Sequence, residues 1–469
     1  MPVIHLPQAL TILQAAIRKS VPRAGFQIPV VEAVGCVAAE TVVALIDHPP
    51  SAQSLRDGVA YASPPNSDAL ERWSKLPFLS DTENVRELVG EVFPGDPSPP
   101  PLSPGQAIRI MTGATVPEST SGVAMIEEVE WLCALDRQWQ SSKSSAAWSI
   151  AQSATHVRLQ TQHPQLHVLP QGAIYHCGAE LIHFGTRLNP VHIGLLSSTG
   201  RESLACFAEP RISVLTTGDE LIPPGRQLRS GQIYNSNGAL LQALLRQTCR
   251  ADVTVQHLGD SETQIAAWLE QQLGHTDLIL TTGAVSAGQK DQLPALFSRF
   301  GVQTLFHGVN IKPGKPVYCG RFDLASTTAL SAGPLNTMVL GLPGNPISVW
   351  VTFQLFARPL IESLRGSHHQ PRWVNARLSK SGNYQDNRLT FWPGRLHWTS
   401  SPWDATDRCD SEESGAMSLQ HEPIVTPLEW QGSPDLRAPT EANCLIYFSS
   451  SSPAPQAESR VKVLLLPDE

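Results

Sequence analysis

The feature that most constrains the fold of this chain is an alternation of apolar strands and amphipathic helices between residues 206 and 365. Residues 211–217 and 278–280 are apolar runs typical of buried strands, whereas residues 236–246 place leucines on one face of a helix. Strands that alternate with helices pair in parallel and are covered by helices on both faces. The pattern therefore predicts a three-layer α/β domain with a mostly parallel sheet.

The stretch 277–291 gives the first indication of a ligand site in this domain. Its strand ends at Gly283 and passes into a loop of small residues that includes Ser286 and closes on Asp291. Open α/β sheets bind ligands at the carboxyl ends of their strands, where small residues let backbone N–H groups approach a phosphate. An acidic residue beside such a loop can hold a cation. We therefore expect a phosphate-binding loop with a cation near Asp291.

Two further loops at strand ends carry charge. Residues 217–220 read Thr-Gly-Asp-Glu, and their consecutive carboxylates could bind Mg²⁺ or a ligand hydroxyl, or form a solvated turn. In residues 312–315 two lysines flank a Pro-Gly turn, which suits an oxyanion such as phosphate or molybdate. Two solvated surface lysines are the alternative interpretation of that loop.

A helix start supplies the fourth element. Asn345 is a candidate N-cap that follows Gly344, Pro346 suits the first helical position, and Ser348 lies in the first turn. The unpaired N–H groups of such a helix start attract anions, although the sequence also fits an ordinary strand–turn–helix junction. Because all four elements fall at one predicted sheet edge, a phosphate-containing ligand with a metal ion is the simplest interpretation.

Composition and missing motifs exclude several other classes of protein. A net charge of −8 gives no sign of nucleic-acid binding, and no apolar run reaches the roughly 18 residues that a membrane span needs. The eight cysteines have no metal-ligand spacing, so we expect a soluble protein of a reducing compartment. The chain contains neither GxxxxGK[ST] nor a strand–GxGxxG–helix unit, which excludes a P-loop NTPase and a dinucleotide fingerprint.

The segments on either side of the α/β region have a different pattern of apolar and polar residues. Residues 6–20 have helical periodicity, and short strand-like pieces separated by proline-rich loops follow. Residues 138–153 are rich in Ser, Ala and Gln and are expected to be a flexible surface insertion. The last hundred residues alternate apolar and polar positions, which predicts a small all-β domain or barrel.

These motifs together resemble those of one family. The shared elements are 57–58 (DG), 109–114 (RIMTGA), 217–220 (TGDE), 231–237 (GQIYNSN), 281–283 (TTG), 312–316 (KPGKP), 341–348 (GLPGNPIS) and 431–433 (QGS). In this order they resemble the molybdopterin molybdenumtransferase family of the MoeA type, which includes the E domain of gephyrin. The resemblance covers essentially the whole chain.

The resemblance implies a multidomain α/β and β fold. Its parts are a discontinuous linker domain, an inserted β-rich domain, a MogA-like three-layer α/β domain and a C-terminal β-barrel-like domain. The implied boundaries are 1–45 with 160–205, 46–159, 206–365 and 366–469, respectively.

The resemblance also implies an activity, namely the insertion of molybdate into adenylylated molybdopterin with release of AMP, assisted by Mg²⁺. It implies a cytoplasmic homodimer, with a molybdopterin adenylyltransferase as a candidate partner and with neither nucleic acid nor membrane involved. One alternative is a paralogue that binds the pterin nucleotide as a scaffold. A second is a molybdopterin adenylyltransferase, although that family usually has a single domain.

Site residues follow from the resemblance, position by position. The implied catalytic residues are Asp57, Asp291, Lys312 and Lys315, and the implied metal ligands are Glu220, Asp277 and Asp291. The implied pterin-nucleotide contacts are Thr217, Gly218, Asp219, Glu220, Asp277, Gly283, Ser286, Gly344, Asn345 and Ser348, of which Ser348 joins the two lysines at the oxyanion.

Three departures from the family pattern motivate the scaffold alternative. Residues 52–62 read AQSLRDGVAYA, which keeps Asp57 but lacks the carboxylate that usually precedes it. Residues 173–180 read AIYHCGAE where the family has RxxGED, so that Gly178 and Glu180 remain. Ala284 stands where the family favours a second glycine.

Overall fold

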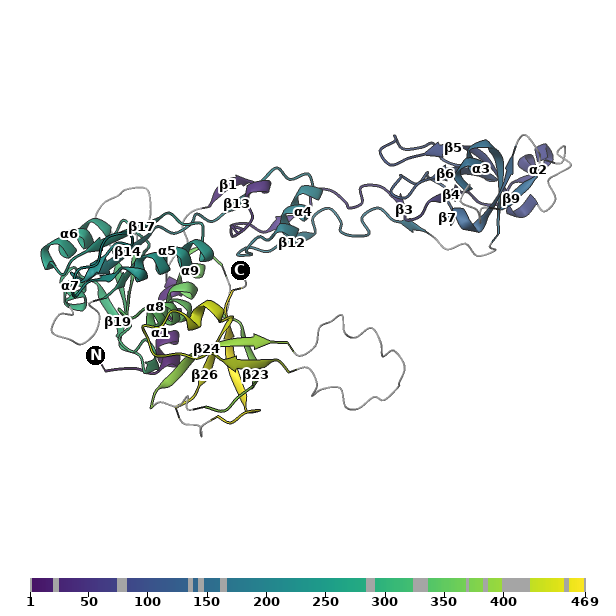
Figure 1. The fold of residues 1–469 in the computed structure, drawn as a ribbon. Helices are drawn as coiled ribbons and strands as arrows, with labels where there is room; N and C mark the ends of the chain where they lie inside the picture. The colour runs from purple at the N-terminus through teal and green to yellow at the C-terminus, as the bar shows by residue number, and fades with distance from the viewer. Residues whose placement is uncertain are drawn as a thin grey trace, which may run out of the picture. The chain divides into compact units, whose positions relative to one another are not determined.

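The computed structural model describes residues 2–19, 25–73, 82–133, 138–141, 147–160, 167–283, 292–323, 336–367, 371–382, 387–398, 422–450 and 455–467 (Figure 1). The chain forms two compact units, which we describe separately. The first comprises Met1–Glu40, Phe184–Ile193 and Ser203–Glu469, and the second comprises Thr41–His183 and Gly194–Glu202.

A six-stranded sheet in the order β17-β14-β18-β22-β21-β19 forms the centre of the first unit. Its strands are β14 (Ile212–Thr217), β17 (Val253–Leu258), β18 (Leu278–Thr282), β19 (Gln303–His307), β21 (Tyr318–Asp323) and β22 (Asn336–Leu342). The pairs β17–β14, β14–β18 and β18–β22 are parallel, whereas β21 pairs antiparallel with both β22 and β19. The mostly parallel sheet predicted from the strand–helix alternation is therefore present.

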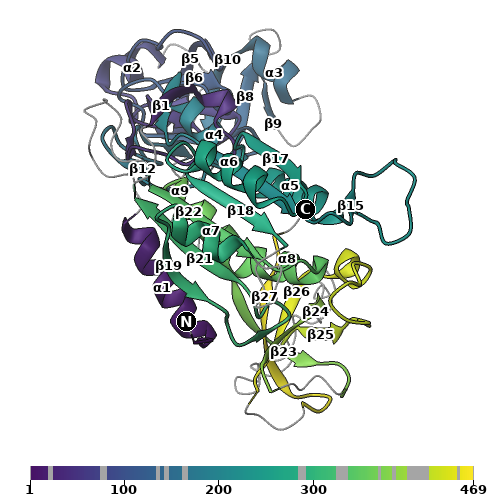
Figure 2. The same cartoon turned by 90° about the vertical axis from the view of Figure 1, so that its left-hand side faces the viewer.

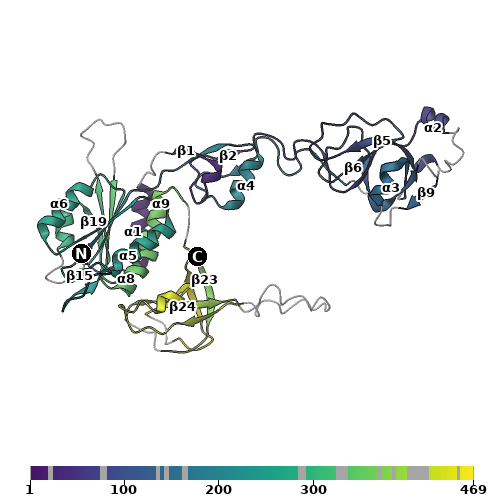
Figure 3. The same cartoon turned by 45° about the horizontal axis from the view of Figure 1, so that its top comes forward.

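Helices cover both faces of this sheet. They are α1 (Leu6–Lys19), α5 (Ser236–Thr248), α6 (Glu262–Gln272), α7 (Leu293–Arg299), α8 (Pro346–Thr352) and α9 (Arg358–Leu364), and a π-helical turn, Phe353–Ala357, joins α8 to α9. Neighbouring residues of β18 face opposite cores: Leu280 packs in the core with α1, α5, α8 and α9, and Ile279 packs with α6 and α7. Figure 3 shows α6 on one side of the sheet and α5, α1 and α9 on the other. The three-layer prediction is confirmed.

The C-terminal strands close into a ring. The order β20-β24-β25-β23-β27-β26 is completed by an additional β24–β26 pairing. The strands are β20 (Ile311–Lys312), β23 (Trp373–Leu378), β24 (Leu389–His397), β25 (Ile424–Pro427), β26 (Cys444–Phe448) and β27 (Arg460–Leu465), with a short helix at Ala438–Glu441. The ring encloses an apolar core of its own. Lys312, the last residue of β20, is also the first of residues 312–315, which we call the lysine loop. This loop therefore contributes one strand to the ring's sheet.

Shorter elements complete the first unit. A two-stranded antiparallel pair joins β1 (Phe26–Pro29) to β13 (Ser203–Cys206), and a 3₁₀ turn, Val30–Glu32, follows β1. After β14, the chain makes an exposed excursion bounded by β15 (Leu221–Ile222) and β16 (Ile233–Tyr234), which pair in parallel. Figure 2 shows this excursion extending away from the helices and the sheet.

A seven-stranded sheet in the order β7-β4-β6-β5-β10-β8-β9 dominates the second unit. Its strands are β4 (Gly58–Tyr61), β5 (Val85–Val92), β6 (Gln106–Ile110), β7 (Gly122–Met125), β8 (Val129–Cys133), β9 (Trp139–Ser141) and β10 (Ala154–Leu159). Helices α2 (Ser67–Trp73) and α3 (Ala147–Ser153) accompany it, with 3₁₀ turns at Thr82–Asn84 and Ile126–Glu128. Trp131 of β8 is fully buried in an apolar core of this unit.

The expected flexible insertion at 138–153 is wrong in its described parts. β9 pairs with β8 in the sheet, and α3 places Ala151 in the core beside Trp131. The guanidinium of Arg109 donates a 2.8 Å hydrogen bond to the Ala151 carbonyl oxygen and fixes the helix. The Ser/Ala-rich composition did not predict β9 and α3, because these elements are stabilised by contacts with the sheet and have no clear local periodicity.

The remaining elements are small. β2 (Val42–Val43) pairs with β12 (Glu180–Ile182), and β3 (Gln53–Ser54) pairs with β11 (Val168–Leu169). α4 (Pro190–Ser198) is a short helix. None of the helices in the described residues is long and apolar enough to span a membrane. The four domain boundaries given above stay predictions.

Candidate functional site

The carboxyl ends of β14, β18 and β22 meet at one edge of the sheet. β18 pairs in parallel with both other strands, with Thr282 opposite Thr216 on one side and opposite Leu342 on the other. The ends approach closely: a Cβ atom at Gly283, whose φ is +89°, would lie 2.8 Å from the carbonyl oxygen of Thr217. Glycine at position 283 is therefore required by both its conformation and its neighbour.

Asn237 connects two of these strand ends to the start of α5. Its side-chain Nδ2 donates to the Thr282 hydroxyl at 3.0 Å and to the Gly344 carbonyl oxygen at 2.7 Å. The side chain is buried, and among the described residues its Oδ1 has no hydrogen-bond partner. A buried acceptor without a partner is unusual in a folded protein. Asn237 is the last residue of the GQIYNSN motif, but the spacing of that motif did not predict that Asn237 belongs to the site.

Asn235 fixes the same helix start from the other side. Its Oδ1 accepts the N–H of Gly238 at 3.0 Å, which makes it the N-cap of α5. Its Nδ2 donates to the Thr216 hydroxyl at 2.7 Å. The two asparagines therefore orient α5 against the strand ends, and the edge of the sheet is rigid before any ligand arrives.

The two acidic residues after β14 differ in their environment. Asp219 is exposed, and its Oδ1 accepts the backbone N–H of Asp260 at 3.0 Å, so it stabilises the turn after β17. This is the turn role considered above as the alternative to ligand binding. Glu220 is also exposed at the edge of the sheet, where its carboxylate is accessible to a cation. Thr217 and Gly218, which precede them, are buried at the strand end.

Asp277 does not lie with the other predicted metal ligands. It precedes β18, whereas Gly283 follows it, so at about 3.3 Å per residue the two lie roughly 20 Å apart. Its buried carboxylate accepts the backbone N–H of Arg211 at 2.7 Å and two guanidinium hydrogen bonds at 3.3 Å. The structure therefore does not bring Asp277 and Glu220 together: Asp277 pairs with Arg211 at the opposite edge of the sheet.

A magnesium site at the strand ends would use fewer protein ligands. The described residues contain no group of three His, Cys, Asp or Glu side chains that could hold a metal ion by themselves. Mg²⁺ usually takes only one or two carboxylates together with substrate phosphates, so Glu220 with a phosphorylated substrate fits its chemistry. Asp291 and Ser286, like Ala284, lie outside the described residues.

The lysine loop follows β19, whose carboxyl end lies at the same edge because β19 and β22 both run antiparallel to β21. Gly314, with φ of +109°, lies against α8: a Cβ there would approach the Thr352 side chain to 2.5 Å. Lys312 belongs to β20 and pairs with Thr390 of the ring, and it is half-buried. Lys315 is exposed. The loop therefore holds one lysine firmly and leaves the other accessible to a ligand.

The start of α8 offers fewer anion-binding groups than the sequence indicated. Asn345 occupies the N-cap position without a side-chain cap hydrogen bond, and Pro346 has no N–H. The N–H of Ile347 donates to the carbonyl oxygen of Ser433 at 3.1 Å. Two of the first three helical positions therefore cannot offer a donor to an anion. Ser348 is buried, with its carbonyl oxygen accepting the Thr352 hydroxyl at 2.6 Å.

Asp57 organises a turn in the second unit. Its Oδ1 accepts both the backbone N–H and the hydroxyl of Thr112, each at 2.7 Å. Its backbone carbonyl accepts the N–H of Ile126 at 3.0 Å. The DG and RIMTGA motifs, far apart in the sequence, are thus one structural element with Asp57 at its centre.

Known proteins similar to this chain decide its family. Residues 4–200 match the family model of the MoeA N-terminal region (domains I and II), and residues 213–363 match that of a probable molybdopterin binding domain. The chain is 31% identical over 345 residues to molybdopterin molybdenumtransferase 2 of Mycobacterium tuberculosis, covering 72% of this chain and 75% of that protein. This chain belongs to the molybdopterin molybdenumtransferase family.

Other members of the molybdopterin molybdenumtransferase family agree with this assignment. The molybdopterin molybdenumtransferase of Haemophilus influenzae is 30% identical over 344 residues, which cover 73% of this chain and 72% of that protein. The crystal structure of the molybdopterin biosynthesis moeA protein of Pyrococcus horikoshii OT3 matches with a TM-score of 0.71 at 22% identity, covering 99% of this chain and 100% of that one. The expected fold class, with a MogA-like α/β domain and a C-terminal barrel, is confirmed.

The segment that replaces RxxGED in this molybdopterin molybdenumtransferase family member keeps an ordered backbone. The N–H of Gly178 donates to the Ala44 carbonyl oxygen at 2.8 Å. Asp47 accepts the N–H of Cys177 at 2.8 Å, and this hydrogen bond, together with one from Gln171, holds the pKa of Asp47 below its usual value. The segment has therefore lost charged side chains of the family pattern without losing its folded conformation.

Proposed function

We propose that this chain inserts molybdate into adenylylated molybdopterin and releases AMP, in the molybdenum cofactor biosynthesis that its family carries out. The observation that carries the proposal is the meeting of three strand ends and the lysine loop at one edge of the α/β sheet. The names of the relatives supply the reaction class, and this edge supplies the groups that such a reaction needs.

The lysine loop is proposed to hold the oxyanion. Lys315 is exposed on a loop whose backbone is fixed by the contact between Gly314 and Thr352. An ammonium group acts as a point charge toward molybdate, and a fixed loop keeps that charge in place, so an encounter becomes an oriented transfer. No protein nucleophile is needed for this step.

The glycine-rich strand ends are proposed to bind the pterin nucleotide. Gly283, which is half-buried, has no side chain that would keep phosphate groups away from the backbone at the strand end. Mg²⁺, when bound beside Glu220, would neutralise charge on the phosphates. We further propose that the chain acts in the cytoplasm as a homodimer and receives its substrate from a molybdopterin adenylyltransferase.

Release of AMP tests the reaction. Purified protein with adenylylated molybdopterin, Mg²⁺ and molybdate should release AMP, and the rate should depend on molybdate. Lys315→Gln should raise the KM for molybdate by about tenfold, because it removes one charge-assisted contact. Lys380→Gln, which removes an exposed lysine elsewhere, is the matched control.

Binding without turnover would contradict the proposal. Thermal stabilisation by the pterin nucleotide with no AMP released would instead support the scaffold alternative. Light scattering of the purified protein tests the dimer separately.

A further inference from the structure

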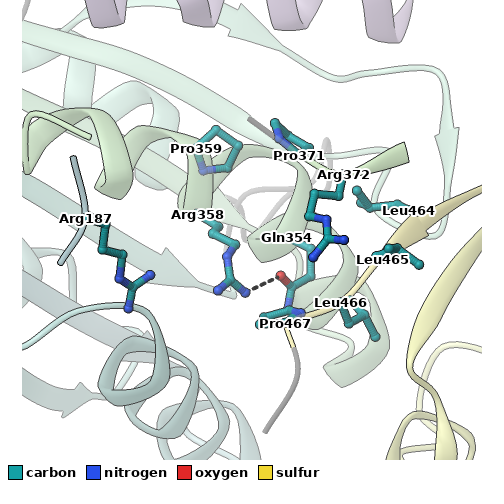
Figure 4. A pocket seen from close by; sticks show the side chains of 10 residues that line it. All are labelled: Arg187, Gln354, Arg358, Pro359, Pro371, Arg372, Leu464, Leu465, Leu466 and Pro467. Carbon is teal, nitrogen blue, oxygen red and sulfur yellow. Dashed lines mark hydrogen bonds between the residues drawn. The ribbon is translucent and has the colours of Figure 1, made fainter. Parts of the chain in front are cut away.

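A small cavity in the first unit is lined by three arginines. Its volume is about 170 Å³, and it lies between α9, the segment before β23 and the end of β27 (Figure 4). Its lining is Arg187, Gln354, Arg358, Pro359, Pro371, Arg372, Leu464, Leu465, Leu466 and Pro467. A pterin nucleotide needs more room than this, because drug-sized ligands occupy roughly 300–1,000 Å³.

The cavity is separate from the proposed substrate site. Arg358 lies twelve residues after Pro346 along the continuous helical run of α8, the π-helical turn and α9. At 1.5 Å per residue, the two positions are roughly 18 Å apart. The lining of the cavity includes no residue of the lysine loop or of the strand ends.

Arg358 is the central cation of the cavity. It is half-buried, and its Nη1 donates to Gln354 Oε1 at 3.2 Å. Figure 4 shows its guanidinium between those of Arg187 and Arg372. Burial lowers the pKa of Arg358; the carboxylate of Glu362 raises it and the charge of Arg187 lowers it again. A cation in such surroundings gains from an added anion.

The carboxylates nearby do not balance the cavity's positive charge. Glu362, which is fully buried, pairs with Arg187 at 3.1 Å and also lies 3.6 Å from Arg365. Arg365 in turn pairs with Glu209 at 2.8 Å. Among these described residues, the negative charge of Glu362 offsets the positive charge of one of the three lining arginines. The charges of Arg365 and Glu209 offset each other. Among the described residues, an excess of two positive charges remains beside the cavity.

The frame of the cavity is fixed by the backbone. The N–H of Leu465 donates to the carbonyl oxygen of Arg372 at 2.9 Å, which holds the segment before β23 against the end of β27. Arg187 is held by its ion pair with the buried Glu362. The three arginines are thus carried by three separate segments of the first unit.

We propose that this cavity is a binding site for a phosphate dianion, either free phosphate or the phosphate group of a small monoester. The excess of two positive charges matches the charge of about −1.5 to −2 that a phosphate group carries at neutral pH. Guanidinium groups bind phosphate oxygens through paired hydrogen bonds. Leu464, Leu466 and Pro467 form the apolar remainder of the lining, against which the organic part of a monoester would pack.

Thermal unfolding with inorganic phosphate tests the site. Sodium phosphate should raise the Tm of the purified protein above the value in sodium chloride of the same ionic strength, because a ligand that binds only the folded state stabilises it. Arg358→Gln should weaken phosphate binding by at least about tenfold, as should Arg372→Gln. Arg299→Gln, which removes an exposed arginine on α7, is the matched control and should keep the shift.

Two further experiments test where phosphate binds and which ligand the site prefers. Lys315→Gln should retain the phosphate shift, since no residue of the lysine loop lines the cavity. Phenyl phosphate that binds more tightly than phosphate assigns a monoester, whereas equal affinities assign the free ion. The proposal is overturned if phosphate gives no shift beyond chloride, or if the shift survives Arg358→Gln and disappears in Lys315→Gln.

Discussion

Asp277, whose carboxylate is buried, forms an ion pair with Arg211 at the amino-terminal edge of the central sheet, about one strand length from the end of β18. The carboxylate accepts the Arg211 backbone N–H as well as its guanidinium, so it joins the start of β18 to the start of β14. The pair therefore acts on the folding of the α/β domain rather than on a metal.

Replacement of Asp277 should affect stability and leave metal dependence unchanged. Asp277→Asn removes the charge from a pair whose carboxylate is buried and whose arginine is partly exposed, so we expect a loss of about 2 kcal/mol. Thermal unfolding measures the loss. The Mg²⁺ concentration for half-maximal AMP release should stay as in the wild type; a large increase would return Asp277 to the metal site.

Gly283→Ala should be more damaging than an alanine at a glycine of the same backbone conformation. Gly283 and Gly225 have φ of +89° and +90°, but a Cβ has open space only at Gly225. Gly225→Ala should cost about 1 kcal/mol for the backbone alone. Gly283→Ala adds a 2.8 Å contact with the Thr217 carbonyl oxygen, so its Tm should fall further. Equal Tm values for the two variants would show that the strand ends can separate freely.

Asn237→Asp should disturb the edge of the sheet. The change replaces the Nδ2 donor with an oxygen that faces the Gly344 carbonyl oxygen and the Thr282 hydroxyl. Two hydrogen bonds of a buried side chain are affected, so we expect a loss of about 1–3 kcal/mol together with weaker pterin-nucleotide binding. Calorimetric titration measures the affinity. Asn375→Asp, at an exposed position of β23, should leave both quantities unchanged.

The stability of the second unit should depend on pH through His156. Burial lowers the pKa of this histidine, while the charge of Glu87 raises it in part, and its ring packs edge-on against Trp73. Below about pH 6.5 the unfolded chain binds a proton that the folded protein excludes, so stability should fall as the pH is lowered from 7.5 to 5.5. His156→Gln should reduce this fall in Tm, whereas His275→Gln, at an exposed position, should not.

Much of the α/β domain could be predicted because its signals are local. The apolar run before Gly283 is a strand, and Asn235 caps α5, since periodicity and capping chemistry act over a few neighbouring residues. Strand direction was the missing information for Asp277. Asp277 comes before β18 and Gly283 comes after it. Because the two residues are close in the sequence, we expected them at the same edge of the sheet, whereas the strand holds them at opposite edges.

Other features depended on contacts that no local pattern carries. The order of α3 comes from Arg109 and the neighbouring core, and the role of Asn237 comes from two strand ends that meet only in the folded sheet. The Ile347 N–H was expected to be open to an anion, but the Ser433 carbonyl oxygen from a distant segment occupies it. Composition and spacing do not report such long-range partners.

Lys312 lies on β20, which pairs with β24 of the C-terminal ring although its neighbours along the chain belong to the α/β domain. Any change of the ring that shifts β24 will therefore move the backbone of this lysine. The two domains cannot diverge independently at this point, and exchanging the ring between relatives should alter molybdate affinity even when every residue of the lysine loop is kept. A chain cut after residue 365 would retain the α/β layers but lose the strand that fixes Lys312.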